Sequence, residues 1–387
     1  MALSALDTQR LYQALQLAQN AVGVSDPNPR VGCVLGNDTG EVWGTGYTQQ
    51  AGGPHAEVMA LRQADTTGHG LRGATAWVTL EPCAHHGRTP PCCDALVEAG
   101  LARVVVAVQD PFEQVAGRGI ARLRAAGIVV DLADGPVAEA ARELNIGFFS
   151  RVERGRPWVR LKVAASLDGQ TALHNGASQW ITGTAARADG HAWRKRAGAV
   201  LCGIGTVLAD NPRLDVRLVS TTLQPLRVVV DSKLRLPPAA RVLQPPGQAL
   251  VVTAASQADP RAQALRDAGA EVVTLPGPGG RVDLPALLTL LAKRGVNELH
   301  VEAGAELNAA LIGQALVDEL LVYVAPLLIG PGRPMAQLPA LSFLAAAPRL
   351  RWVETATVGD DLRLRARVLA PAGLQGAVGV LDSTTSF

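Results

Sequence analysis

The fold of this chain has to bring together three side chains that lie far apart in the sequence: His55, Cys83 and Cys92. With Glu57 beside the histidine, they occur in the order typical of hydrolytic zinc sites, where a His/Cys/Cys set holds the ion and a glutamate moves protons. Three protein ligands leave one position for a water molecule, whose pKa zinc lowers to about 7. If His55 lies in the first turn of a helix, Glu57 points elsewhere around the axis and is predicted to reach the water rather than the ion.

The cysteine spacing departs from the compact Cys-x-x-Cys motif of many zinc deaminases, because eight residues separate Cys83 from Cys92. Cys92 follows two prolines and precedes an amphipathic run, so we expect it to open a helix, whose N-terminus favours the thiolate. Cys93 is a rival ligand, but adjacent helical residues diverge by about 100° and only one can face the ion. Cys33 and Cys202 lie in apolar runs and are interpreted as buried side chains.

Length and composition favour a multidomain enzyme acting on small molecules. At 387 residues the chain is longer than a domain with a single hydrophobic core usually is, and its 48% hydrophobic content is enough to form more than one core. The sequence has no apolar run of membrane-spanning length and no signal peptide at its start, and its five cysteines fit a reducing compartment, so we expect a soluble cytoplasmic protein. A net charge of +2 argues against nucleic-acid and membrane partners. We also expect a homo-oligomer.

The first 150 residues alternate between predicted strands and helices, which indicates a sheet covered by helices on both faces. Strands are expected over 31–35, 42–47, 74–80, 104–108 and 128–132. Helices are expected from Asp7, as N-cap, to about Asn20, from His55 onwards, over 120–126 and up to Leu144. The metal-binding side chains therefore collect at the ends of strands and helices.

A break in the pattern between Arg151 and Pro157 places a domain boundary there, giving domains 1–150 and 151–370 and a loose tail 371–387. The second domain alternates again, with strands expected over 158–164, 199–202, 227–230, 249–253, 271–275, 298–302, 320–328 and 361–369. Two of its loops, 202–206 and 302–308, follow strands and open helices, so their backbone N–H groups suit phosphate binding. Neither matches the full dinucleotide fingerprint, but two such loops in one domain favour a bound nucleotide.

Several longer motifs closely resemble the bifunctional riboflavin biosynthesis proteins of bacteria, over residues 7 to about 369. They are 26–33, 54–58, 79–92, 115–119, 162–169, 178–182 and 317–320, of which 79–92 is the most specific. The resemblance implies an α/β chain with an N-terminal cytidine-deaminase-like three-layer αβα domain and a C-terminal dihydrofolate-reductase-like domain. The first would deaminate 2,5-diamino-6-(ribosylamino)pyrimidinone 5′-phosphate. The second would use NADPH to reduce the ribosyl group, giving 5-amino-6-(ribitylamino)uracil 5′-phosphate.

The resemblance also assigns roles to individual residues. His55, Cys83 and Cys92 become zinc ligands, and Glu57 becomes the proton shuttle. The residues implied for NADPH are Ala164, Trp180, Thr206, Asp210, Ser232, Gly304, Ala305, Glu306, Leu307, Asn308, Ala309 and Ala310. Those implied for substrate are Ser178, Arg194, Leu214, Arg217 and Glu302. Lys162 and Glu302 are catalytic candidates that polarise or protonate the sugar as hydride arrives at its C1′, since ring opening requires proton movement.

Two positions depart from the family pattern. Phe112 stands where the family commonly has asparagine, which puts a polar substrate contact in doubt, and Asp215 replaces a frequent threonine. The other polar side chains near these motifs can be explained without a catalytic role. Three of them shape the long loop, although Arg88 is also a candidate for binding phosphate: His85, His86 and Arg88. Four more are interpreted as surface or core histidines: His69, His174, His191 and His300. Two other functions stay open, a single-function base, nucleoside or tRNA deaminase with an inert second half, and a nucleotide-binding module with structural zinc.

Overall fold

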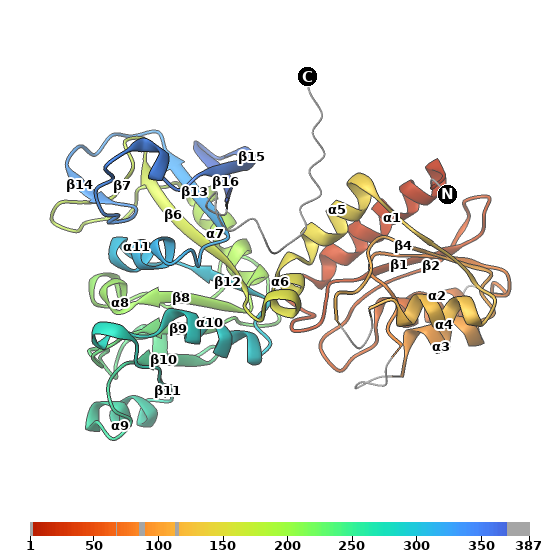
Figure 1. Ribbon diagram of the computed structural model, residues 1–387, viewed down its shortest axis with the longest axis horizontal. Helices are drawn as coiled ribbons and strands as arrows, with labels where there is room; N and C mark the ends of the chain where they lie inside the picture. The colour runs from red at the N-terminus through yellow and green to blue at the C-terminus, as the bar shows by residue number, and fades with distance from the viewer. Residues whose placement is uncertain (1–2, 67, 85–89, 113–115, 370–387) are drawn as a thin grey trace.

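The computed structural model describes residues 3–66, 68–84, 90–112 and 116–369, and these form two α/β domains. Figure 1 shows the domains side by side, with helix α6 (Ile146–Arg154) between them. The predicted tail, 371–387, lies outside the described residues, as do His85, His86 and Arg88. None of the helices in the described ranges has both the length and the apolar composition needed to cross a bilayer.

The first domain is built on a five-stranded sheet with the order β2-β1-β3-β4-β5. Strand β1 runs antiparallel to β2 and β3, whereas β3, β4 and β5 are parallel. Its strands are β1 (Gly32–Gly36), β2 (Val42–Tyr47), β3 (Thr75–Val78), β4 (Arg103–Val106) and β5 (Val129–Leu132). Its helices before α6 are α1 (Ala5–Ala18), α2 (Ala56–Thr66), α3 (Cys92–Glu98), α4 (Arg118–Ala125) and α5 (Gly135–Leu144).

Successive residues of the strands enter two different cores, as the alternation of side chains in a strand requires. Val34, Trp77 and Val105 pack with α1 and α5, whereas their neighbours Cys33 and Val78 pack with α2, α3 and α4. The sheet is therefore covered by helices on both faces, which confirms the three-layer prediction.

The beginning of α1 differs from the sequence prediction. Ser4, not Asp7, is the N-cap, and Asp7 is the N3 residue of a capping box with it. The buried Asp7 carboxylate also accepts hydrogen bonds from Trp77 Nε1 and Arg103 Nη1, each at 2.8 Å. The prediction of Asp7 as N-cap was wrong because its side chain is directed into these tertiary contacts.

The second domain is built on a nine-stranded sheet with the order β11-β10-β9-β8-β12-β6-β13-β16-β15. Strand β16 runs antiparallel to both of its neighbours, β13 and β15, and the other adjacent pairs of this sheet are parallel. The strands of the domain are β6 (Trp158–Ser166), β7 (Gln170–Leu173), β8 (Ala199–Gly203), β9 (Leu226–Val230), β10 (Ala249–Thr253), β11 (Glu271–Thr274), β12 (Glu298–Val301), β13 (Glu319–Ala325), β14 (Gly332–Pro334), β15 (Leu350–Val358) and β16 (Asp361–Val368). The helices are α7 (Thr184–Arg196), α8 (Ile204–Asp210), α9 (Pro260–Asp267), α10 (Leu284–Lys293) and α11 (Ala305–Gly313).

Helices cover both faces of this sheet as well. Leu287 and Leu291 of α10 and Leu311 of α11 pack on one face, whereas α8 and α9 pack on the other. The strand expected over 320–328 ends at Ala325, before Pro326, which cannot donate a ladder hydrogen bond. Strand β15 was not predicted.

Buried charges join the two domains. The Glu298 carboxylate accepts hydrogen bonds from Arg30 Nη1 at 2.6 Å, Arg160 Nη1 at 2.7 Å and Arg196 Nε at 2.9 Å. Arg30 belongs to the first domain and the other three residues to the second, so one carboxylate ties the domains together. The boundary proposed at residue 150 falls inside α6 and stays a prediction.

Candidate active sites

The three expected metal ligands come together in the first domain. His55 lies one residue before α2, Cys83 follows β3, and Cys92 is the first residue of α3. Their ligand atoms all lie within 4.8 Å of one another, with His55 Nδ1 at 3.2 Å from Cys92 Sγ and 3.7 Å from Cys83 Sγ. His55 is thus not in the first turn as expected, but its carbonyl accepts a hydrogen bond from Met59 N–H at 3.1 Å and so begins the helix.

Two glycines of β2 place α2 against the sheet. A Cβ added to Gly46 would lie 2.2 Å from the Ala56 carbonyl oxygen, and one added to Gly44 would lie 2.2 Å from that of Ala60. Because only a residue without a side chain permits this approach, the glycines fix the start of α2 and hence the position of His55.

The two thiols of the site have different acidities. A hydrogen bond from Cys92 is the largest of the effects that lower the pKa of Cys83 to about 4, and the same bond raises the pKa of Cys92. This shift favours the thiolate form of Cys83, which is the form that binds metal. Cys93 lies outside the group, since its thiol donates to the Pro82 carbonyl at 3.2 Å and burial raises its pKa.

Two carboxylates near the metal ligands, those of Glu57 and Glu81, differ in burial and in hydrogen bonding. Glu57 is 3% exposed, and burial raises its pKa to about 7 although the nearby His55 opposes this shift. Glu81 accepts hydrogen bonds from the backbone N–H groups of Gly117 at 2.9 Å, Ile120 at 3.1 Å and Asp110 at 3.2 Å. Glu81 thus anchors the segment that carries Cys83, a role that the sequence analysis did not assign to it.

A cavity of about 390 Å³ opens onto this site and is lined by both domains. The first domain contributes His55, Glu57 and Cys83, together with Asp110 and Phe112. Phe112 therefore does line the pocket in which a polar contact was in doubt, and burial raises the pKa of the adjacent Asp110 to about 7. The second domain contributes residues that no sequence motif indicated: Ala292, Lys293 and Gly295.

A larger cavity, of about 1820 Å³, lies in the second domain. All residues predicted for cofactor, substrate or catalysis there line it except Ala309. Five further cations also line it and were not among the residues predicted for cofactor or substrate: Lys233, Arg235, Arg241, Arg281 and Arg333. Lys233 and Arg235 follow the carboxyl end of parallel strand β9, a position that favours ligand binding and could have indicated them. This concentration of positive charge suits phosphorylated ligands.

Three charged side chains meet on the wall of this cavity. Arg194 donates to both Glu302 oxygens, from Nε at 2.5 Å and from Nη2 at 2.9 Å. Burial opposes ionisation of Glu302, but the positive charge of Arg194 lowers its pKa well below the usual value. Burial lowers the pKa of Lys162, whose ammonium lies 5.7 Å from the centroid of the Tyr323 ring. The buried His300, 3.3 Å from Glu302, lies behind this group, as a core histidine was expected to.

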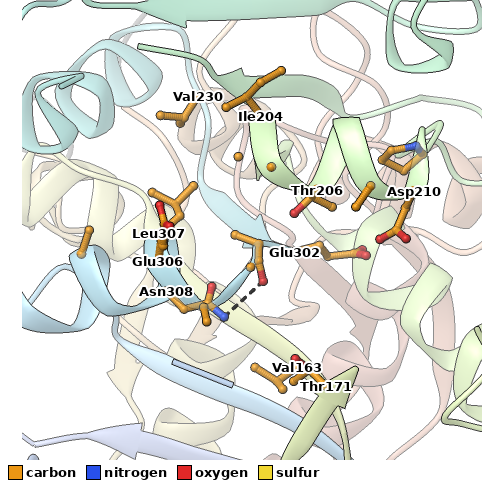
Figure 2. A pocket seen from close by; sticks show the side chains of 18 of the residues that line it. Val163, Thr171, Ile204, Thr206, Asp210, Val230, Glu302, Glu306, Leu307 and Asn308 are labelled. Atoms are coloured by element: carbon orange, nitrogen blue, oxygen red, sulfur yellow. Dashed lines mark hydrogen bonds between the residues drawn. The ribbon is translucent and has the colours of Figure 1, made fainter. Parts of the chain in front are cut away.

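The two glycine-containing loops adjoin each other (Figure 2). A Cβ added to Gly203 would lie 3.2 Å from Leu307 Cδ2, and one added to Gly304 would lie 3.9 Å from Thr206 Oγ1. Asn308 holds the second loop by donating to the Ala303 carbonyl at 3.2 Å. The N-termini of α8 and α11 therefore border the same cavity, and their free backbone N–H groups are suited to phosphate.

Asp215, the second departure from the family pattern, organises the arginines beside the cavity. It is buried and accepts hydrogen bonds from Arg213 Nε at 2.8 Å and Arg217 Nη1 at 2.6 Å. The buried His191 accepts the backbone N–H of Arg217 at 3.1 Å. Asp215 and His191 together position Arg217, whose side chain is nearly half exposed.

Helix α10 reaches both cavities. Its N-cap Asp283 and its first residues Leu284 and Pro285 line the large cavity, whereas Ala292 and Lys293 at its other end line the small one. At 1.5 Å per residue its ten residues span about 15 Å.

Comparison with protein families matches each domain separately. Residues 5–108 match the cytidine and deoxycytidylate deaminase zinc-binding region, and residues 157–364 match the RibD C-terminal domain. The fold and the two sites therefore define a two-domain enzyme of the α/β class, with a cytidine-deaminase-like domain followed by a reductase domain of dihydrofolate-reductase type.

Relatives match over nearly the whole chain. The riboflavin biosynthesis protein RibD of Escherichia coli K12 is 45% identical over 371 residues, which cover 92% of this chain and 98% of the relative. The solved structure of Acinetobacter baumannii RibD, form 1, matches with a TM-score of 0.85 at 41% identity, and the match covers 94% of this chain and 99% of that chain. A Thermotoga maritima diaminohydroxyphosphoribosylaminopyrimidine deaminase/5-amino-6-(5-phosphoribosylamino)uracil reductase has a TM-score of 0.83 at 32% identity, with the same two coverages.

The chain belongs to the RibD family and is a bifunctional deaminase and reductase of riboflavin biosynthesis. Its substrate is a pyrimidine ribose phosphate intermediate. Membership excludes both alternatives left open by the sequence, the single-function deaminase and the non-enzymatic binding module.

Proposed function

We propose that the first domain is a zinc enzyme that hydrolyses the 2-amino group from 2,5-diamino-6-(ribosylamino)pyrimidinone 5′-phosphate. The convergence of His55, Cys83 and Cys92 carries this proposal, because one imidazole nitrogen and two sulfurs within 4.8 Å fit zinc. When bound, zinc supplies the Lewis acidity that makes water a nucleophile near neutral pH. Glu57, buried beside the cavity with a pKa of about 7, takes up a proton from water and returns it to the departing amine.

We propose that the second domain reduces the ribosyl group of the deaminated product with NADPH. When bound, NADPH would supply a hydride to C1′, and the bond between C1′ and the ring oxygen would break with its electron pair left on that oxygen. The Lys162 ammonium donates a proton to that oxygen, and Glu302 holds Arg194 in place beside the sugar. The loops of Gly203 and Gly304 hold the cofactor phosphates, together with the predicted cofactor residues that line the cavity.

The remaining site assignments are also proposals. Arg217, half exposed beside the cavity, takes the substrate phosphate in the reductase site, with Ser178 and Leu214 lining the same space. Exposed apolar side chains on and before the edge strand β15, Phe343, Leu344 and Trp352, support a homo-oligomer. Five free cysteines support a location in the cytoplasm.

Reciprocal variants of the full chain test the two activities. Glu57→Gln should stop ammonia release from the diaminopyrimidine phosphate while leaving NADPH oxidation intact when deaminated substrate is supplied. Lys162→Met should do the reverse, with a loss of about 100-fold or more in the reduction rate. The wild type should contain one zinc per chain, which Cys83→Ser should lose. Loss of both activities in either folded variant would contradict two separate sites.

A further inference from the structure

The turn between α10 and β12, residues 294–297, is fixed against the rim of the deaminase cavity. Asn297 Nδ2 donates to Asp26 Oδ1 at 2.7 Å and to the Pro27 carbonyl at 3.1 Å. Arg151 Nε donates to Asn297 Oδ1 at 2.6 Å. Gly295 has a φ of +82°, and a Cβ there would lie 2.8 Å from Pro27 Cβ. The second domain is thus part of the wall of this cavity, and its contribution is held by hydrogen bonds.

The charges around the cavity are arranged by depth. Glu57 and Asp110 are buried, at 3% and 7% exposure, whereas Lys293 is exposed at the rim. Acidic groups therefore lie at the inner end, beside the metal ligands, and a cation lies at the outer end. A substrate with an uncharged pyrimidine at one end and a phosphate dianion at the other matches this arrangement when its phosphate points outwards.

Lys293 is also free to bind an anion. Of the lining cations in the described parts of the chain, Arg151 already donates to Asn297 and to the Pro27 carbonyl. Lys293 forms no ion pair with any carboxylate of the described residues, whereas the next residue, Arg294, is paired with Glu271 at 2.5 Å and does not line the cavity. An unpaired ammonium at the mouth of a pocket is suited to a phosphate.

We infer that the reductase domain completes the substrate site of the deaminase, with Lys293 binding the 5′-phosphate of the pyrimidine substrate. This inference rests on the deaminase substrate proposed above. It assigns a binding role to a residue more than 200 positions from the metal ligands, and it explains why the two domains are joined by a fixed interface at this rim.

The test compares Lys293→Ala with Lys293→Arg and with Arg294→Ala, which removes a neighbouring cation from outside the cavity. Deamination by the zinc-loaded full chain is measured with the phosphorylated substrate and with its dephosphorylated nucleoside. Lys293→Ala should raise KM for the phosphorylated substrate about tenfold, with little change in kcat and none for the nucleoside. Lys293→Arg should retain most of the affinity, and Arg294→Ala should resemble the wild type.

A binding measurement separates affinity from turnover. In a Glu57→Gln background, calorimetry should show that adding Lys293→Ala weakens binding of the phosphorylated substrate about tenfold. An unchanged KM and affinity in Lys293→Ala, or equal losses on both substrates, would overturn the inference and leave the proposed function standing. A wild-type chain that does not deaminate the phosphorylated substrate would instead overturn the proposed function, and the inference with it.

Discussion

Replacing Glu298 with glutamine should strongly destabilise the interface between the domains. The carboxylate is 1% exposed and is shared by three guanidinium groups, those of Arg30, Arg160 and Arg196. Although burial alone would raise the pKa of Glu298, these three charges lower it well below its ordinary value. Glu298→Gln keeps the shape of the side chain but removes the one carboxylate that, among the described residues, pairs with all three arginines.

The expected loss follows from the partners that remain. Arg160 keeps a second carboxylate, Glu319 at 2.6 Å, whereas the one acid left near Arg30 in the described part of the chain is Asp26 at 3.6 Å. Arg196 is left with the Leu144 carbonyl at 3.0 Å. Removing one partner of a buried ion pair costs about 3–5 kcal/mol, because the stranded charge stays out of water. We expect a loss in this range from the free energy of unfolding.

Equilibrium urea unfolding, read from the midpoint and slope of the transition in which the interface separates, measures this loss. Glu271→Gln is the matched control, because Glu271 also pairs with an arginine but is 53% exposed, and should cost no more than about 1 kcal/mol. Because the pKa of Glu298 is lower in the folded state, its contribution to the free energy of unfolding is fully present above the unfolded pKa of about 4.3. This contribution is lost only as the pH falls below that value. The difference between variant and wild type should thus be equal at pH 6 and pH 8. Equal losses in Glu298→Gln and Glu271→Gln would refute the reasoning.

Three further outcomes are expected. Burial, with Arg194 and Arg217 nearby, lowers the pKa of His191 to about 4, so the unfolding free energy should fall as the pH drops from about 6.5 towards 4, by up to about 3 kcal/mol. His191→Gln should remove this dependence, and an unchanged pH profile would contradict the assignment. Gly295→Ala should cost about 1–3 kcal/mol and weaken deamination, because it strains a positive φ and meets Pro27; reductase activity with supplied substrate serves as the control. A zinc chelator should abolish ammonia release but not NADPH oxidation, and parallel loss of both would argue against a metal confined to the first domain.

Much of the fold could be predicted because burial imposes a regular pattern on the strands and helices. The apolar strands around Val34, Val105 and Val228 were placed within a residue or two of their bounds. Strand β15 escaped prediction because it lies at the sheet edge, where Trp352 is 65% exposed and no buried face imposes alternation. Helix α6 was missed because its run ends in charged residues and Gly155, which read as a linker.

The metal group could be predicted because the chemistry of zinc limits which residue types can serve, and His, Cys and Glu are conspicuous in a sequence. The residues at the rim of the deaminase cavity could not be predicted from the sequence. Lys293 lies in an ordinary amphipathic helix of the other domain, and contacts between the turn after that helix and the first domain, such as the one between Asn297 and Asp26, bring it to the pocket. A local sequence pattern does not show which residues from distant parts of the chain come into contact.

Helix α10 is one continuous helix whose N-terminus borders the large cavity and whose C-terminus borders the small one. Its leucines are locked into the core, so a displacement along its axis cannot be absorbed within the helix and must appear at both ends. A substitution that moves Asp283 or Pro285 in the large cavity will therefore also shift the part of the small cavity wall that Ala292 and Lys293 form. The two active sites of this chain therefore cannot be redesigned independently at positions on α10.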